Sequence, residues 1–450
     1  MGKNASIITL LLIIAIWVPG TLIRLNHLTD RTMGHIEIYA PNIDMPYELS
    51  DPRPRMSLLK TVTGTFWEPH PPAWYILMWP WTKWFGTELF VLRLPSLIFG
   101  AMSILLVYML ASQVETRLTA LISMGLLAFN GHQILWSQIA RPYILSVFIG
   151  LLATLLLLKS LQDGKRQKFF LLIYSLVSML GLTTTYYYWP FYAVHILWVM
   201  VLTWIKDNRQ TGLFLSQLLT LILASPLVAL AIFQSKDSYL LGNPLVFLRN
   251  YFSFGFLFEP DLDAGLFNQQ PLVILLVVPL FGLLLFLIGW LNRGKNERTM
   301  QLPKFQHFSK AYLFVATSLA VLVIFMAAFA FNTKDPSKTN AILLSSVMPV
   351  LLLMLAYLAQ RRSSITVKIG SYLDQKLFLG QPSSLVNLLA ILPILMIAAI
   401  SLFIPFFASR QALLFVPFLL IVIARGTARL LSNTRTLFSY ATMLPLALGL

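Results

Sequence analysis

Residues 66–100 read FWEPHPPAWYILMWPWTKWFGTELFVLRLPSLIFG, and this stretch joins a polar loop to apolar sequence of membrane-spanning character. Glu68 and His70 precede two prolines, and Arg93 lies just inside the next apolar run. Ionisable groups cost free energy at membrane depth, so those that occur there usually mark a working site. The stretch therefore predicts a membrane protein whose functional residues gather at one boundary of the bilayer.

The composition of the whole chain supports a membrane protein. Of its 450 residues, 58% are hydrophobic and 11% are charged. Apolar runs of about 20 residues, which suffice to cross a bilayer as helices, recur from end to end. The first run, residues 5–23, lacks an A-x-A-like cleavage site, so we interpret it as an uncleaved helix rather than a signal peptide. The chain has no cysteine, which excludes disulfides, thiolate metal sites and thiol nucleophiles.

Counting the apolar runs predicts an all-α polytopic membrane protein with about twelve transmembrane helices. The segment 73–86 is ambiguous, because it is short, contains Lys83 and an internal proline, and has four tryptophans of interfacial character. Residues 437–450 stay apolar, which leaves a thirteenth span open. The expected spans are 5–25, 89–112, 117–135, 141–160, 168–185, 190–205, 211–233, 271–291, 311–331, 340–359, 384–405 and 411–431.

The distribution of charge predicts the side on which each loop lies. The formal net charge of +16 reflects the cytoplasmic loop bias of a membrane protein rather than nucleic-acid binding. With Met1 inside and 73–86 at the outer interface, 20 of the 33 Lys and Arg residues fall inside, whereas 12 of the 17 acids fall outside. A crossing at 73–86 would put every later loop on the other side, so we expect a juxtamembrane segment there.

This topology predicts one transmembrane domain over residues 1–450 with two long outer loops and no soluble C-terminal domain. Loops of this length without regular structure are usually functional or disordered. The first, 26–88, mixes both signs of charge with aromatic residues, and its prolines forbid one long helix, so we expect short helices on the membrane surface. The second, 234–270, contains an apolar aromatic segment at 244–258 that fits an interfacial helix.

Four motifs occur in order between residues 70 and 197: HPPAWYILMWPWTKWFG, ELFVLRLPSLIFG, SQIARPYILSVFIGLLATLLLLKSL and TTTYYYWPFYAVHIL. In order and spacing they resemble the bacterial GT-C glycosyltransferases of the protein-mannosyltransferase and lipid A aminoarabinose-transferase type. Members of that family typically read HPPLYY, ALRLPS, an ARMYALLL-like segment and a THYY-like segment. The resemblance covers residues 5–205 well and is weaker in the C-terminal half, where FASRQALLFVPFLLIVIA (407–424) is similar to the family's RYLLPALP element.

The resemblance implies a sugar carried on a polyprenyl phosphate and transferred to a lipid, glycan or protein acceptor at the outer face of the bacterial inner membrane. It also implies a catalytic base in the first outer loop, where members show an Asp-Glu pair and this chain reads RTMGHIEIYAPNIDMP. Glu37 is the nearest equivalent and Asp44 is the alternative. His35 could orient the base or, together with Glu37 and His70, bind a divalent metal ion such as Mg²⁺, Mn²⁺ or Zn²⁺; whether a metal is needed stays open.

The chemistry independently calls for a base near the acceptor oxygen and for cations near the departing phosphate. Arginine suits the second task because its planar fork pairs with phosphate oxygens bidentately. Arg141 and Arg410, at outward-facing span ends, are the first candidates for the donor phosphate, and Lys334 and Arg93 are further ones. The candidate substrate-pocket residues are Glu68, His70, Tyr143 and Tyr187.

Each of these residues also has a structural interpretation. Glu37 could be a solvated loop acid, Arg93 an interface anchor and Tyr187 part of an aromatic belt. A different GT-C activity, such as a glycan ligase or polymerase, is the closest competing function. A multi-pass lipid or solute transporter is the other class. Transporters usually carry ionisable residues at mid-membrane, whereas the spans expected at 211–233, 271–291 and 311–331 contain none.

Overall fold

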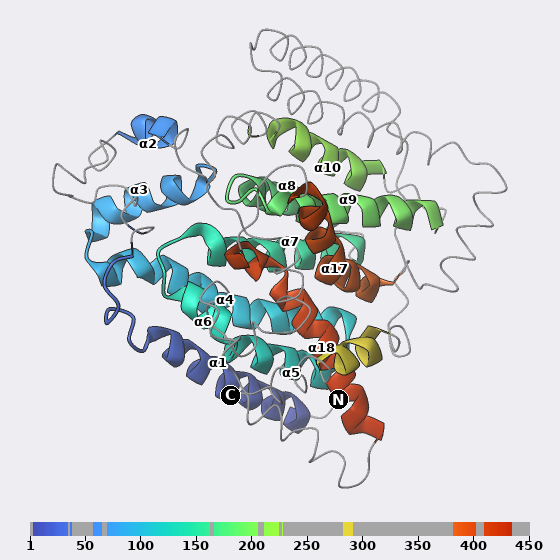
Figure 1. The fold of residues 1–450 in the computed structure, drawn as a ribbon. Coiled ribbons are helices and arrows are strands. Elements are labelled where there is room, and N and C mark those ends of the chain that lie inside the picture. Colours follow the sequence, from blue (N-terminus) through green and yellow to red (C-terminus); the bar gives the residue numbers. More distant parts are fainter. Residues whose placement is uncertain are drawn as a thin grey trace.

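The regular structure of the protein is helical. The computed structural model describes residues 3–34, 37, 57–64, 70–162, 166–205, 211–224, 227, 282–290, 381–401 and 409–433, and no strand occurs in these ranges. Their helices, arranged as in Figure 1, are α1 (Lys3–Leu25), α2 (Leu58–Gly64), α3 (Ala73–Phe85), α4 (Leu89–Val114), α5 (Arg117–Ala128), α6 (Gly131–Ser137), α7 (Pro142–Gln162), α8 (Gln167–Leu182), α9 (Tyr188–Ile205), α10 (Thr211–Ala224), a helical stretch at 282–290, α17 (Pro382–Ser401), the 3₁₀ helix η6 (Ser409–Leu414) and α18 (Val416–Asn433).

Within these ranges, three helices are long and apolar enough to cross a membrane, namely α1, α4 and α7. The bent pair α5 and α6 passes the same test when taken as one span, and α8, α9 and α17 are shorter apolar helices. These helices fit the predicted all-α membrane protein. The count of about twelve spans stays a prediction, because 311–331 and 340–359 lie outside the described residues and 271–291 is described only at 282–290.

The span expected at 117–135 is broken into α5 and α6, which are bent by 57°. Phe129 ends α5, and its N–H donates to the carbonyl of Gly125. The chain restarts at Asn130, whose side chain accepts a hydrogen bond from the Gln133 N–H at 2.9 Å and so caps α6. The break is therefore a capped junction, and it places α6 at an angle to the helices around it.

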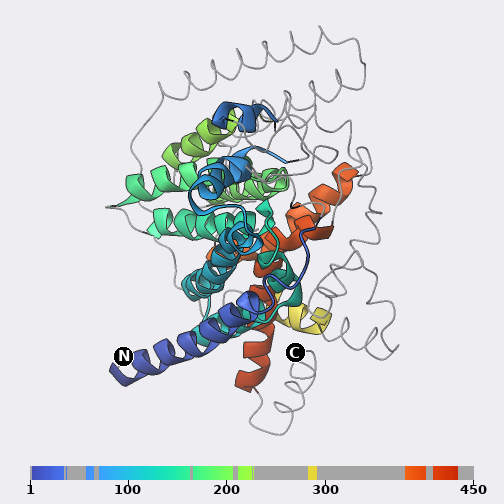
Figure 2. The same ribbon diagram turned by 90° about the vertical axis from the view of Figure 1, so that its left-hand side faces the viewer.

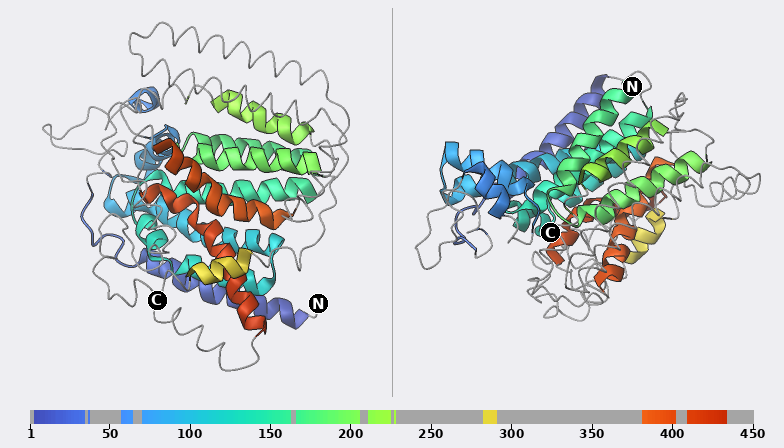
Figure 3. Two further views of the ribbon diagram at one scale, coloured as in Figure 1. Left: turned by 45° about the vertical axis from the view of Figure 1, so that its right-hand side comes forward. Right: turned by 90° about the horizontal axis from the view of Figure 1, so that it is seen from above.

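The segment 73–86 forms α3, a helix of 13 residues. At 1.5 Å per residue it is about 20 Å long, which is too short to cross a hydrocarbon core of about 30 Å. One face, with Trp74, Tyr75 and Met78, is buried, whereas Trp84 is 75% exposed. Figure 3 shows α3 beside α2 at one end of the bundle, an arrangement that fits a juxtamembrane helix.

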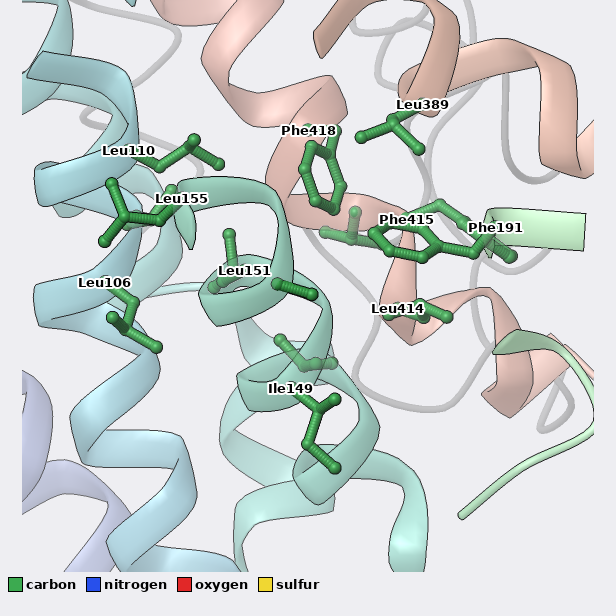
Figure 4. Close-up of a cluster of buried hydrophobic side chains, with 14 of the residues drawn as sticks. Leu106, Leu110, Ile149, Leu151, Leu155, Phe191, Leu389, Leu414, Phe415 and Phe418 are labelled. Atoms are coloured by element: carbon green, nitrogen blue, oxygen red, sulfur yellow. The ribbon is translucent and has the colours of Figure 1, made fainter. Parts of the chain in front are cut away.

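The core lies around α7, which packs against α4 on one side and against α8 and η6 on others. Gly150 of α7 allows a close contact with η6, since a Cβ there would lie 2.6 Å from Cδ1 of Leu414. Figure 4 shows buried side chains that meet at this place: Leu106 and Leu110 of α4, Ile149, Leu151 and Leu155 of α7, Phe191 of α9, Leu389 of α17, Leu414 of η6, Phe415, and Phe418 of α18.

Helix α1 lies at the edge of the bundle (Figure 2) and exposes much of its apolar surface. It is joined to α5 by Arg24, which is buried and donates to the carbonyls of Ala128 (2.6 Å) and Leu127 (3.0 Å). Gln138, just after α6, returns the contact by donating to the carbonyls of Arg24 and Asn26. The end of α1 and the α5–α6 junction thus satisfy each other's free carbonyl groups.

Two further sets of polar contacts join helices of the bundle. Near the C-terminal end of α4, Arg425 of α18 pairs with Glu115 and also donates to the carbonyl of Gly289 and the amide oxygen of Asn387. Among α7–α10, His195 lies between Thr154 and Tyr174, at 3.2 Å from each hydroxyl. Both sets are buried, and interhelical hydrogen bonds of this kind help to associate helices in a membrane, where the hydrophobic effect between helices is absent.

Candidate functional site

Glu37 and Arg93 form a buried ion pair that fixes the start of the loop after α1 to α4. Nε of Arg93 donates to Oε1 of Glu37 at 2.9 Å, and a terminal nitrogen donates to Oε2 at 2.7 Å. Both side chains are 2% exposed. This is the bidentate geometry that makes Arg–carboxylate pairs strong.

Two backbone groups complete the surroundings of the Glu37 carboxylate. The Ala140 N–H donates to Oε1 at 2.8 Å, and the Gly34 N–H donates to Oε2 at 3.0 Å. Each oxygen therefore accepts two hydrogen bonds, which uses about four lone-pair positions, the full capacity of a carboxylate. Burial acts to raise the pKa of Glu37, but the hydrogen bonds from Arg93, Ala140 and Gly34 outweigh it and hold the pKa below its ordinary value.

The hydrogen-bond donors of Arg93 are occupied as fully as the acceptor positions of Glu37. Besides its bonds to the carboxylate, it donates to the carbonyls of Leu28 (2.7 Å), Arg31 (3.0 Å) and Thr32 (3.2 Å). A guanidinium has five N–H groups, and these bonds use all five. The predicted roles of Glu37 as base and of Arg93 as a phosphate ligand stay predictions, and this geometry argues against both because it leaves neither side chain a free position.

Arg141 lies next to this ion pair in the chain, one residue after Ala140. It is buried at the start of α7, and its terminal nitrogen donates to the hydroxyl of Tyr75 in α3 at 3.0 Å. A buried guanidinium held at a helix start has the charge and geometry that bind phosphate oxygens. Arg141 therefore keeps its place as the first candidate for the donor phosphate.

His70 and Tyr143, both predicted pocket residues, lie in contact with each other. Nε2 of His70 is 3.1 Å from the Tyr143 hydroxyl, and both side chains are buried. Trp136 of α6 packs edge-on against the Tyr143 ring, with 4.8 Å between ring centroids. The HPP motif and the start of α7, 73 residues apart, are thereby joined at one place.

Tyr187 is also buried at this end of the bundle, in the turn between α8 and α9. That turn is fixed to the start of α3 by a hydrogen bond of 2.9 Å from the Ala73 N–H to the Thr183 carbonyl. The structure thus brings together five predicted residues: Glu37, Arg93, Arg141, His70 and Tyr143, with Tyr187 on an adjoining turn.

Several predicted residues are placed less fully. Arg410 lies on η6, whose backbone is described and whose Leu413 carbonyl is bonded to Gln133 of α6. The remaining predicted residues lie outside the described ranges: His35, Asp44, Glu68 and Lys334. Their assignments stay predictions.

The predicted metal site finds little support among the described residues. In them no group of three or more potential ligands of the His, Cys, Asp or Glu type occurs. Of the three residues considered, His35 is outside these ranges and His70 bonds Tyr143. Glu37 already accepts four hydrogen bonds, so its oxygens do not fit a metal ion in this arrangement.

Sequence reasoning missed three contributors to the site. Tyr75, the partner of Arg141, lies within AWYILMWP, a stretch that was interpreted from its tryptophans. The Ala140 N–H is a backbone group without a sequence signal. Gln133 lies inside an expected span. A polar amide there costs free energy unless it has a hydrogen-bond partner, so its position indicated a contact within the protein.

Comparison with known proteins agrees with the motifs. Residues 69–229, about a third of the chain, match the profile of the dolichyl-phosphate-mannose-protein mannosyltransferase family. This segment contains His70, Tyr75, Arg93, Arg141 and Tyr143. The matched segment contains all four motifs by which the chain resembles the GT-C glycosyltransferases. No curated protein matches the chain.

Solved structures of an oligosaccharyltransferase from Archaeoglobus fulgidus resemble the chain over most of its length. The complex of AglB with an inhibitory peptide and a dolichol-phosphate has 14% identity and a TM-score of 0.44, and the match covers 100% of this chain and 55% of that one. The complex with Zn and sulfate has 15% identity and a TM-score of 0.41, with 96% and 51% covered. The chain spans about half the length of these proteins.

Proposed function

We propose that this protein is a membrane glycosyltransferase that transfers a sugar from a polyprenyl-phosphate donor to an acceptor at the outer face of a bacterial inner membrane. The observation that carries the proposal is the joining of family-matched residues at one end of the bundle. There Arg141 bonds Tyr75 and His70 bonds Tyr143, beside the loop that Glu37 and Arg93 fix. The predicted topology, with Met1 in the cytoplasm, puts this end outside.

The reaction is a displacement at the anomeric carbon of the donor sugar. An acceptor hydroxyl forms the new carbon–oxygen bond, the bond from the anomeric carbon to the phosphate oxygen breaks, and polyprenyl phosphate leaves. A carboxylate of the first loop takes the acceptor proton as general base. Arg141, Arg410 and Lys334 supply cations for the charge that develops on the phosphate. Because the lone pairs of Glu37 are used, Asp44 becomes the preferred base.

The acceptor class is a lipid, a glycan or a protein, and the test uses one of each. Purified full-length protein in bilayer discs is incubated with radiolabelled polyprenyl-phosphate sugars and each acceptor class, with and without Mg²⁺, Mn²⁺ or Zn²⁺. We expect transfer that Asp44→Asn abolishes. Transfer only of whole preassembled glycans supports the ligase or polymerase alternative. Movement of labelled lipid across the bilayer without any transfer supports the transporter and overturns the proposal.

A further inference from the structure

The link between α6 and α7, residues 138–141, contacts two separate parts of the protein. The Ala140 N–H donates to Oε1 of Glu37, in the loop after α1, at 2.8 Å. One residue later, a terminal nitrogen of Arg141 donates to the hydroxyl of Tyr75, in α3, at 3.0 Å. The link therefore connects the loop after α1 to the first candidate for the donor phosphate.

The link turns sharply at Ala140. The Arg141 N–H donates to the Ile139 carbonyl at 2.8 Å, which is the bond between residues i and i+2 that defines a γ-turn. Within the described ranges His27 is the one non-glycine residue with a positive φ, so Ala140 has a negative φ and the turn is of the inverse type. Pro142 follows, and a residue before proline is restricted to extended conformations. The backbone of Arg141 is therefore constrained on both sides.

The position of this turn depends on Glu37. Ala140 and Glu37 are each 2% exposed, so the hydrogen bond between them is shielded from water. The Glu37 carboxylate is itself held from other sides by Arg93 and by the Gly34 N–H. A buried N–H that loses its acceptor costs free energy. Replacing Glu37 would therefore release a turn that lies 103 residues later in the chain.

The side chain of Arg141 needs this support for its predicted role. A guanidinium pairs with phosphate oxygens through a planar fork, so its donors must be held in place by the groups behind it. Tyr75 holds a terminal nitrogen, and the γ-turn holds the backbone. Loss of the contact between Glu37 and Ala140 would remove the support of the backbone.

We propose that Glu37 is a positioning residue for Arg141: through the Ala140 N–H it holds the γ-turn from which the Arg141 side chain reaches the donor phosphate. The inference rests on the proposed function, in which Arg141 binds that phosphate. It gives Glu37 a role other than that of a base, and it couples the order of the loop after α1 to donor binding. Such coupling is reciprocal, so a bound donor also stabilises the loop.

The test is a cycle of substitutions in the full-length protein. Glu37→Met removes both acceptor oxygens and keeps a side chain of similar length. Calorimetric titration measures binding of a short-chain polyprenyl-phosphate sugar to the unmodified protein, Glu37→Met, Arg141→Ala and the double variant. We expect Glu37→Met to weaken donor binding about tenfold, within the range typical of coupled sites. In the Arg141→Ala background the same change should add little, because residues that act through one group are not additive.

Glu115→Met is the matched control. Glu115 follows the other end of α4, where it forms a buried pair with Arg425. The change removes the same kind of carboxylate from the same kind of pair, so it should lower the midpoint of thermal unfolding as Glu37→Met does. It should leave donor affinity unchanged, which separates positioning from a general loss of stability.

A second measurement does not depend on how well Glu37→Met folds. Donor at a concentration that saturates the unmodified protein should slow hydrogen–deuterium exchange in peptides that cover residues 26–34, because donor binding stabilises the loop after α1. Donor at a concentration that saturates Arg141→Ala should leave exchange of these peptides unchanged, because the coupling runs through Arg141.

The outcomes separate this inference from the proposed function. Unchanged donor affinity in Glu37→Met, an equal loss in both backgrounds, or an equal loss in Glu115→Met overturns the positioning role. Exchange at 26–34 that does not respond to the donor overturns it as well. A transfer rate that falls at saturating donor while donor affinity stays constant makes Glu37 the base and also overturns it. If Arg141→Ala itself leaves donor binding unchanged, the proposed donor site fails, and the inference fails with it.

Discussion

The guanidinium of Arg93 and the carboxylate of Glu37 satisfy each other across 56 residues of sequence, with bonds of 2.9 and 2.7 Å. The same pair gathers the carbonyls of the loop that precedes Glu37 and the N–H of Ala140. An acid in this loop can thus be needed for the fold without touching a substrate, because it fixes the start of the loop to α4.

The first prediction separates a structural Glu37 from a catalytic one. Glu37→Gln leaves Arg93 with an uncompensated buried charge, and breaking such a pair costs about 3–5 kcal/mol. We expect Glu37→Gln to lower the midpoint of thermal unfolding in detergent. Arg93→Met should lower the same midpoint, because it also breaks the pair. If Glu37 is the base, transfer falls about 10²–10⁴-fold while the unfolding midpoint stays that of the unmodified protein.

The second prediction concerns pH. The pKa of Glu37 is lower in the folded protein than in the unfolded chain, so its contribution to stability is present above the unfolded pKa and is lost as pH falls through the folded one. The difference in unfolding midpoint between the unmodified protein and Glu37→Gln should therefore be constant near neutral pH and shrink below about pH 4. A difference that grows on acidification contradicts the ion pair.

The third prediction concerns Arg141. Arg141→Ala should weaken donor binding, and Arg141→Lys should restore it only in part, because an ammonium lacks the planar fork. Tyr75→Phe removes the hydroxyl that Arg141 bonds while keeping the ring, so it should weaken donor binding less than Arg141→Ala does. Calorimetric titration with a short-chain polyprenyl-phosphate sugar measures all three. Equal affinity in every variant would remove Arg141 from the donor site.

The fourth prediction concerns topology and uses the absence of cysteine in the chain. Single cysteines at Lys83, in α3, and at Gln113, near the other end of α4, both replace exposed side chains. With Met1 in the cytoplasm, an impermeant thiol reagent added outside intact cells should label position 83 and spare position 113. The reverse pattern would put the candidate site on the cytoplasmic side.

The apolar helices were predictable because the signal is local. Long apolar runs give α1, α4 and α7 within a few residues of the expected spans, and the Trp-rich composition of 73–86 indicates a short interfacial helix. The break at Asn130 was missed because hydrophobicity continues across it, although an Asn-Gly pair is a turn signal.

The partners in the site were not predictable, because they depend on contacts distant in sequence. The motifs named His70, Arg141 and Tyr143, yet no local pattern says that Arg93 binds Glu37 or that His70 meets Tyr143. Gln133 and Leu413 are the extreme case, at 280 residues apart.

The contacts around the first loop also set an order for its assembly during synthesis. Arg24 finds its acceptor in Ala128 only after 104 further residues have been made, and the Glu37–Arg93 pair is completed by Ala140. At about 5–20 residues per second, the loop waits roughly 5–20 s after α1 emerges before it can close. Stalled ribosome complexes ending before Ala140 should leave the loop open to protease, whereas longer ones should protect it. Insertion machinery that holds α1 through this interval would then decide how much of the protein matures.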